Sequence, residues 1–407
     1  MMNDLKVELK EVQEAQRGLQ KYLKPSPLLL NPWLSNIFGC NVYLKLENMQ
    51  PIGSFKIRGA TYKISLLNEG EKKRGVIAAS AGNHAQGVAW GSKQLGVNAL
   101  IVMPIGASII KVQNTKALGA EVILKGNNYD ESFAYAQELS EKTGRVFLHA
   151  FEDKAIIAGQ GTVGLEILDQ LPAVDYVVGS VGGGGLMAGV STVLKELKPD
   201  TKIIGCQALN AASMVASVRE GKAVRLSSAD TFADGIAVLQ ASEPLRHILA
   251  KNIDSWIEVS EDAIAAAVLT LLEKAKILTE GSGAVTLAAL DFLKKKIQNK
   301  NVVLIISGGN IDVNILSRII YTGLVRAGRR VRVNVVISDR PGALARLTDL
   351  ISKEGANIIQ AIHDRNEPST RFDQAEVELT LETRGSDHSA KLIEALKTVV
   401  LRLELTH

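Results

Sequence analysis

The chain has 407 residues, of which 46% are hydrophobic and 22% are charged, a composition typical of globular proteins with two or three domains. The 47 basic and 43 acidic residues leave a net charge of only +4, which argues against a nucleic-acid polymer as a partner. No run of about 18 apolar residues is present and the first residues are charged, so we expect a cytoplasmic protein without a membrane span or signal peptide.

Neither disulfides nor metal ions are expected. Cys40 and Cys206 lie beside apolar sequence and are interpreted as reduced, buried thiols. The six histidines are scattered, and no pair has the spacing of metal ligands. We therefore predict no metal site.

Most of the chain alternates short apolar runs with helical patterns. Alternating strands and helices of this kind predict an α/β fold with mainly parallel sheets covered by helices on both faces. Strands are expected over 42–46, 76–79, 100–103, 121–124, 176–178, 203–207, 257–259 and 302–306. Helices are expected over 4–23, 56–67, 85–95, 109–118, 130–142, 186–197, 263–275 and 284–293.

The pattern changes near residue 330. Strands over 331–337, 358–362, 375–381 and 401–405 combine with a helix over 344–353 and a second helix that starts at Ser386. This order is β-α-β-β-α-β, which indicates a ferredoxin-like α+β domain. We expect a large domain over 1–325 and a small domain over 330–407.

Two segments predict the chemistry. Lys56 follows Phe55 at a loop-to-helix junction, and its amine can form a Schiff base with an aldehyde and then act as a base at a substrate's α-carbon. Phe55 is a candidate to pack on the aldehyde's ring. Four consecutive glycines between a strand and a helix offer backbone N–H groups to a phosphate: Gly182, Gly183, Gly184 and Gly185. Together these segments indicate pyridoxal 5'-phosphate.

Two further turns lie at strand ends. Ser307 follows the strand 302–306, and its hydroxyl would leave the cofactor's ring nitrogen largely unprotonated, which favours β-elimination over transamination. The other turn opens a helix, and its N–H groups are candidates to bind a substrate carboxylate: Ser80, Ala81, Gly82, Asn83 and His84. Asn83 is also a candidate for the cofactor's ring oxygen. Alternatively, this turn is a local helix cap and His84 only bonds a backbone carbonyl.

The motifs 53–60, 79–87, 182–186, 233–238, 280–284 and 307–310 occur in a specific order. With them the chain resembles the fold-type-II pyridoxal phosphate enzymes, in particular the threonine dehydratases (threonine deaminases). The resemblance implies a two-lobed, tryptophan synthase beta-like fold whose small lobe, about 66–152, is inserted in the catalytic domain. It also implies cofactor contacts from Lys56, Phe55, Asn83, the four glycines, Leu186, Glu280 and Ser307.

The implied activity is that of a lyase. L-Threonine would lose water by α,β-elimination and give 2-oxobutanoate and ammonia, and serine would give pyruvate, in isoleucine biosynthesis or threonine catabolism. Serine racemases are the nearest alternative, but their second turn serine is Ala81 here. Their acidic metal ligands are also missing, since Gln207, Ala211 and Ser213 follow the matching strand. A non-catalytic amino-acid sensor is the other alternative.

The C-terminal segment resembles an ACT regulatory domain. The family implies an amino-acid or nucleotide effector bound at the first loop, by Asp339, Gly342, Ala343 and Leu344. The alternative is that this domain serves mainly subunit assembly. A homodimer or homotetramer is expected from the resemblance.

Overall fold

The computed structural model describes residues 5–366 and 371–405. The chain forms two compact units whose boundary lies between Ile311 and Asp312. Helix α15, Val313–Arg326, was not predicted from the sequence; it is grouped with the second unit, whereas the predicted large domain extends to residue 325. Among the described residues, no helix has the length and apolarity needed to cross a membrane.

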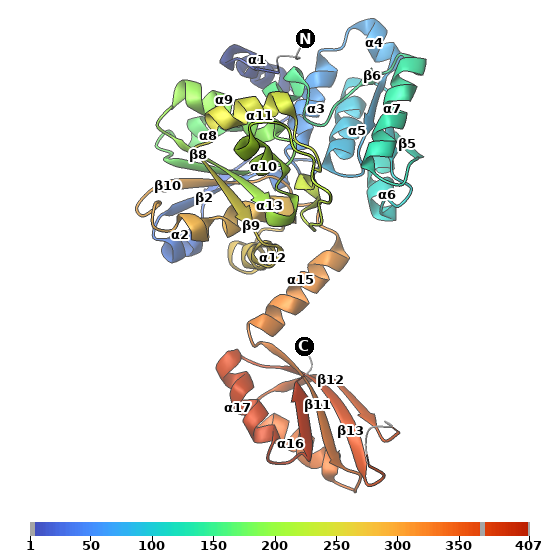
Figure 1. Ribbon diagram of the computed structural model, residues 1–407, viewed down its shortest axis with the longest axis vertical. Coiled ribbons are helices and arrows are strands. Elements are labelled where there is room, and N and C mark those ends of the chain that lie inside the picture. The colour runs from blue at the N-terminus through green and yellow to red at the C-terminus, as the bar shows by residue number, and fades with distance from the viewer. Residues whose placement is uncertain (1–4, 367–370, 406–407) are drawn as a thin grey trace. The chain divides into compact units, whose positions relative to one another are not determined.

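The first unit contains a six-stranded sheet in the order β1-β2-β10-β7-β8-β9 (Figure 1). All neighbouring strands are parallel except β1 and β2. The carboxyl ends of the parallel strands thus meet at one edge, where ligands usually bind. The strands are β1 Leu28–Leu30, β2 Asn41–Leu46, β7 Tyr176–Ser180, β8 Lys202–Ala208, β9 Ser255–Val259 and β10 Asn301–Ile306.

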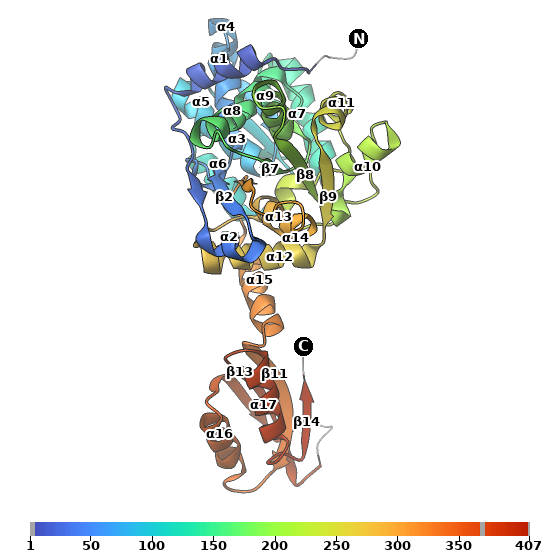
Figure 2. The same cartoon turned by 90° about the vertical axis from the view of Figure 1, so that its left-hand side faces the viewer.

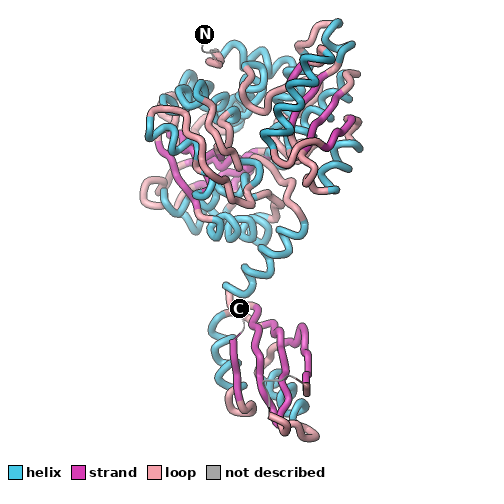
Figure 3. The backbone as a smooth tube through the Cα atoms, turned by 45° about the vertical axis from the view of Figure 1, so that its right-hand side comes forward, coloured by secondary structure: helices cyan, strands magenta, loops and turns pink. Residues whose placement is uncertain are grey.

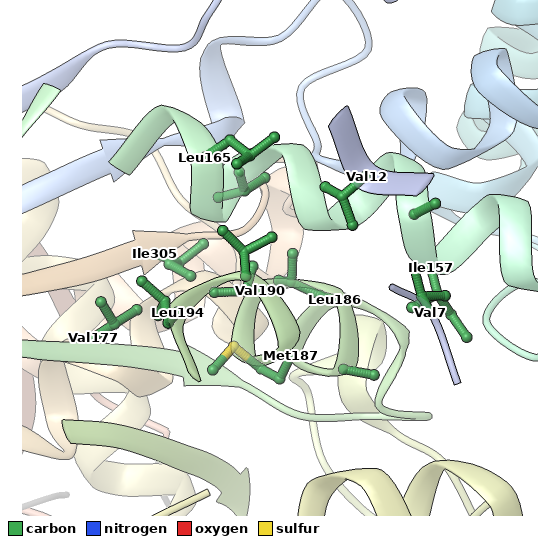
Figure 4. Packing of buried hydrophobic residues seen from close by; sticks show 14 of the residues in the cluster. Val7, Val12, Ile157, Leu165, Val177, Leu186, Met187, Val190, Leu194 and Ile305 are labelled. Atoms are coloured by element: carbon green, nitrogen blue, oxygen red, sulfur yellow. The ribbon is translucent and has the colours of Figure 1, made fainter. Parts of the chain in front are cut away.

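Helices cover both faces of this sheet. On one face, Val177 and Ile305 of the sheet pack against Leu186, Val190 and other apolar residues of the helices (Figure 4). The helices of this core are α1 Leu9–Leu19, α8 Lys154–Gln170, α9 Gly185–Leu197 and α11 Glu243–Asn252. Helices α12 Glu261–Thr270, α13 Gly281–Ala288 and α14 Leu290–Leu293 lie on the other face (Figure 2).

A second, four-stranded sheet of the first unit is parallel throughout, in the order β5-β4-β3-β6. One face packs on α3 Lys56–Ser65 and α5 Asn83–Leu95, and the other on α7 Tyr129–Thr143. This small lobe also contains α4 Glu69–Arg74 and α6 Ile109–Ala117. Its strands are β3 Val76–Ala79, β4 Ala99–Met103, β5 Glu121–Leu124 and β6 Val146–Phe147.

The second unit has the expected β-α-β-β-α-β order after α15. Its antiparallel sheet, order β12-β13-β11-β14, packs one face on α16 and α17 (Figure 3). The inward residues of β13 alternate, as the sequence predicted. The elements are β11 Arg330–Ser338, α16 Ala343–Lys353, β12 Asn357–Asp364, β13 Gln374–Glu382, α17 Ser386–Leu396 and β14 Arg402–Leu405.

The prediction from the sequence missed several helices and strands and misplaced the ends of others. The helix expected over 4–23 spans only Leu9–Leu19, because Glu8 and Glu11 form a capping box that starts it there, and Asp4 lies outside the described residues. Helix α5 begins at Asn83, two residues early, which places Asn83 and His84 in its first turn. Helix α8 was missed because it is buried almost all round and therefore lacks an amphipathic pattern. Also missed were β1, β6, α2 Pro32–Phe38, α4, α10 Ser213–Glu220 and α11.

Candidate active site

The turn before Lys56 forms backbone hydrogen bonds with the residues that follow β10. Ser54 and Gly308 form an antiparallel bridge, the N–H of Phe55 donates to the carbonyl of Ser307 at 3.1 Å, and the N–H of Gly309 donates to the carbonyl of Gly53 at 2.9 Å. Lys56 is then the first residue of α3. Backbone pairing thus brings the predicted covalent residue and Ser307 together at the carboxyl edge of the large sheet.

The amine of Lys56 is partly buried. Its Nζ donates a hydrogen bond to the carbonyl of Ala150 at 3.1 Å and lies 5.3 Å from the centroid of the Phe55 ring. Burial lowers the pKa of Lys56 to about 8, and the Glu280 carboxylate opposes this shift. A lysine with such a pKa is a good nucleophile and base near neutral pH.

The lowered pKa predicts how fast Lys56 reacts in the cofactor-free protein. Only the neutral amine is nucleophilic, so acetylation of Lys56 should rise with pH and level off above about pH 8. The measurement is brief acetic anhydride labelling across pH 6–10, with the acetylated fraction of Lys56 quantified by peptide mass spectrometry and Lys63 on the same helix followed for comparison. Labelling of Lys56 that rises tenfold per pH unit up to pH 10 contradicts the prediction.

The glycine run presents backbone N–H groups that have no hydrogen-bond acceptor among the described residues. Gly183 and Gly184 are buried, Gly184 has a φ of +96°, and α9 begins at Gly185. No oxygen of the described residues accepts a hydrogen bond from the N–H groups of Gly182, Gly183, Gly184, Gly185 or Leu186. Buried N–H groups without partners are costly unless an anion binds them. The helix dipole adds to this preference for a phosphate.

Side chains could not replace these glycines. A Cβ on Gly183 would lie 2.3 Å from Cδ1 of Phe151, and a Cβ on Gly182 would lie 2.9 Å from the Cα of Ile236. Close packing of the backbone therefore requires glycine, in addition to the left-handed conformation of Gly184.

Asn83 and Glu280 form a polar cluster between the two lobes of the first unit. The amide nitrogen of Asn83 donates to both carboxylate oxygens of Glu280, at 2.9 and 3.1 Å. Its amide oxygen accepts a hydrogen bond from Nδ2 of Asn310 at 2.7 Å. Burial, helped by the charge of Asp234, raises the pKa of Glu280. The structure thus brings together two of the residues to which the resemblance assigned cofactor contacts.

Ser307 and His84 occupy buried positions nearby. The hydroxyl of Ser180 at the end of β7 donates to the hydroxyl of Ser307 at 3.3 Å. His84 Nε2 lies 2.9 Å from the carbonyl of Leu148, which fits the interpretation that a backbone carbonyl satisfies this side chain. Burial lowers the pKa of His84 to about 3, so the imidazole is neutral.

The turn 80–84, which is predicted to bind a substrate carboxylate, begins after β3. The hydroxyl of Ser80 accepts a hydrogen bond from the N–H of Gly82 at 3.1 Å, and a Cβ on Gly82 would meet no atom within 4 Å. Open space therefore lies in front of this turn. Carboxylate binding by this turn, which includes Ala81, stays a prediction.

Sequence reasoning missed the loop after β6. Ala150 supplies the carbonyl that holds Lys56, and Phe151 packs against the glycine run. Strand β6 has only two residues, Val146 and Phe147, so no periodic pattern pointed to a strand end there. The residues are recognised only from their contacts.

The predicted effector residues lie in the second unit, at the turn between β11 and α16. Gly342 has a φ of +83° and precedes the first residue of α16, Ala343, while Leu344 is 36% exposed. The carboxylate of Asp339 forms an ion pair with Arg365 at 2.5 Å. No group of three or more potential metal ligands occurs among the described residues.

These residues fit pyridoxal phosphate. The unpaired amides of the glycine run would hold the phosphate, Lys56 the aldehyde carbon, and Ser307, Asn83 and Glu280 the ring. At each position the chemical group of the protein suits the part of the cofactor that it would contact: amides for the phosphate, an amine for the aldehyde and polar side chains for the ring.

Comparison with known proteins agrees with this geometry. Residues 19–308 match the family model "Pyridoxal-phosphate dependent enzyme", and residues 327–400 match the model "ACT domain". An L-threonine ammonia-lyase of Thermotoga maritima is 46% identical over 390 residues, which cover 96% of this chain and 97% of that protein.

Two solved structures are similar to the first part of the chain. The processed form of threonine deaminase isoform 2 from Solanum lycopersicum has a TM-score of 0.72 at 41% identity, and the match covers 77% of this chain and 93% of the other. Maize serine racemase has a TM-score of 0.74 at 32% identity, covering 79% and 99% respectively.

Proposed function

The chain belongs to the pyridoxal-phosphate dependent enzymes, and we propose that it acts as an L-threonine ammonia-lyase with a C-terminal ACT domain. L-Threonine loses water by α,β-elimination, and the unsaturated amine hydrolyses to 2-oxobutanoate and ammonia. L-Serine gives pyruvate by the same route. The observation that carries this proposal is the partly buried Lys56 amine, held at the same sheet edge as Ser307 and the unpaired glycine amides.

Each residue has a distinct task. When bound, the cofactor supplies an electrophilic carbon and a conjugated ring that draws electrons from the substrate's α-carbon. Lys56 is the base that takes the α-proton, because burial keeps its pKa near 8. Ser307 presents a hydroxyl rather than a carboxylate, and therefore leaves the ring nitrogen without a strong charge partner.

The turn 80–84 supports the preference for elimination over racemisation. Racemisation needs a second proton donor on the opposite face of the substrate, and Ala81 has no exchangeable proton. The neutral, hydrogen-bonded imidazole of His84 points away from that task, toward the carbonyl of Leu148. A serine racemase is the alternative because of the fold similarity to the maize enzyme.

One assay tests the proposal. The purified, cofactor-loaded protein should release 2-oxobutanoate and ammonia in equal amounts from L-threonine, at roughly 1–10³ per second. Oxo acids are measured by reduction with lactate dehydrogenase, and chiral chromatography follows D-serine formed from L-serine. Absence of oxo acid from both substrates contradicts the lyase, and D-serine formed as fast as pyruvate supports the racemase. A non-catalytic sensor would bind an amino acid at the ACT unit without turnover.

Regulation, assembly and location complete the proposal. We propose that Asp339, Gly342, Ala343 and Leu344 bind an amino-acid or nucleotide effector, which the left-handed Gly342 and the exposed turn support. A homodimer or homotetramer in the cytoplasm is supported by the family resemblance, and two buried, unpaired cysteines fit a reducing compartment.

A further inference from the structure

The loop 148–152 contacts both ends of the cofactor site. The carbonyl of Ala150 accepts the hydrogen bond from Lys56 Nζ at 3.1 Å. The ring of Phe151 lies against Gly183, whose added Cβ would come within 2.3 Å of Cδ1, and the Cβ of Phe151 lies 3.0 Å from the position of a Cβ on Gly185. The conformation of this loop therefore sets both the direction of the lysine amine and the shape of the glycine run.

His149 holds this loop in shape. Its Nδ1 accepts hydrogen bonds from the N–H of Glu152 at 2.8 Å and from the N–H of Phe151 at 3.3 Å. A side-chain acceptor that binds the N–H groups two and three residues later closes a tight turn, as aspartate and asparagine do in other turns. The carbonyl of Ala150 lies within that turn.

Aromatic neighbours fix the orientation of the His149 ring. Its centroid lies 4.7 Å from that of Phe151 with an interplanar angle of 89°, and 5.5 Å from that of Phe133 at 79°. Phe147 lies 6.4 Å away. Edge-to-face contacts of this kind hold a ring in one rotamer. The small lobe, through α7 and β6, thus aims Nδ1 at the loop.

The His149 imidazole is neutral, which allows its Nδ1 to accept the two backbone hydrogen bonds of the loop. Nδ1 can accept only when the ring is neutral with its proton on Nε2. Burial lowers the pKa of His149, Lys56 adds to this shift, and the carboxylates of Glu152 and Asp153 oppose it. The mechanism above leaves this histidine without any role at the substrate.

We propose that His149 is a positioning residue for the cofactor, which acts through the 148–152 loop by aiming the Ala150 carbonyl at Lys56 and the Phe151 ring at the glycine run. This inference rests on the cofactor chemistry of the proposed function. Its test uses no amino-acid substrate, so its outcome is independent of whether threonine is the substrate.

Three substitutions at His149 distinguish the role of the Nδ1 hydrogen-bond acceptor from the role of the aromatic ring. His149→Asn places an oxygen two bonds from Cβ, where Nδ1 stands. His149→Gln carries the same amide one methylene further and cannot close the turn. His149→Phe keeps the edge-to-face contacts but has no acceptor. The full-length, cofactor-free proteins are titrated with pyridoxal phosphate, and binding is followed by quenching of tryptophan fluorescence.

The dissociation constant should rise about tenfold or more in the Gln and Phe variants and stay within about threefold of the parent in the Asn variant. The melting temperatures of the cofactor-free proteins are measured alongside. Parent-like affinity in the Gln variant overturns the proposal, and so does a loss in the Asn variant as large as in the Gln variant. If the Phe variant does not fold, the comparison of the Asn and Gln variants still tests the proposal.

Discussion

Replacing Lys56 with alanine should lower the rate of 2-oxobutanoate formation from L-threonine by about 10³-fold or more. In the proposed mechanism Lys56 provides both the amine for the cofactor's aldehyde and the base for the α-proton, so one substitution removes two functions. No other lysine replaces it, because the carbonyl of Ala150 and the ring of Phe55 position this amine specifically. The glycine run should still bind the cofactor's phosphate without the covalent bond.

The measurement compares initial rates of oxo-acid release by equal amounts of cofactor-saturated protein. Lys63→Ala is the matched control, since Lys63 lies two turns further along α3 and forms a partly exposed ion pair with Asp153 at 2.7 Å. This control should keep most of the activity. A Lys56→Ala protein with more than about a tenth of the parent rate would refute the assignment of Lys56.

Replacing Arg58 with leucine should lower the free energy of unfolding of the first unit by about 3–5 kcal/mol. Arg58 is 2% exposed, and its guanidinium binds two carboxylates through paired hydrogen bonds. The distances to Glu47 are 2.8 and 2.8 Å, and those to Glu166 are 2.6 and 2.8 Å. Leucine would leave two buried carboxylates with only Lys45, which lies 2.6 Å from Glu166, as a cationic partner.

This cluster joins β2, α3 and α8, and its Arg58 lies two residues after Lys56 in the chain. Despite burial, Arg58 and Lys45 keep the pKa of Glu166 below its usual value, so the carboxylate remains charged. Removing the arginine therefore leaves uncompensated charge in a dry environment, which costs far more than a surface ion pair.

Urea unfolding followed by tryptophan fluorescence measures this effect. All three tryptophans, Trp33, Trp90 and Trp256, lie in the first unit, so the signal reports on that unit. Arg219→Leu is the control, because the Arg219 side chain is 67% exposed in its ion pair with Glu258 at 2.5 Å, and its loss should cost less than about 1 kcal/mol. Equal midpoints for the two variants would contradict the prediction.

Much of the fold follows from local patterns. Strands β3 and β5 have the predicted bounds, and β2, β10 and β13 differ from them by one residue. These elements are short apolar or alternating runs between turn residues, which local sequence specifies. Among the elements that failed prediction, α8 is buried almost all round and β6 has only two residues, so no periodicity distinguishes either of them.

The sequence by itself was enough to propose which residues carry the chemistry. Lys56 after an aromatic residue, a glycine run between a strand and a helix, and a serine at a strand end are local signals, because nucleophile type and backbone conformation depend on the residues themselves. Only the tertiary structure decided how these residues act. The pKa of Lys56 near 8, the unpaired glycine amides and the His149 turn all arise from contacts between distant segments, which burial and long-range packing create.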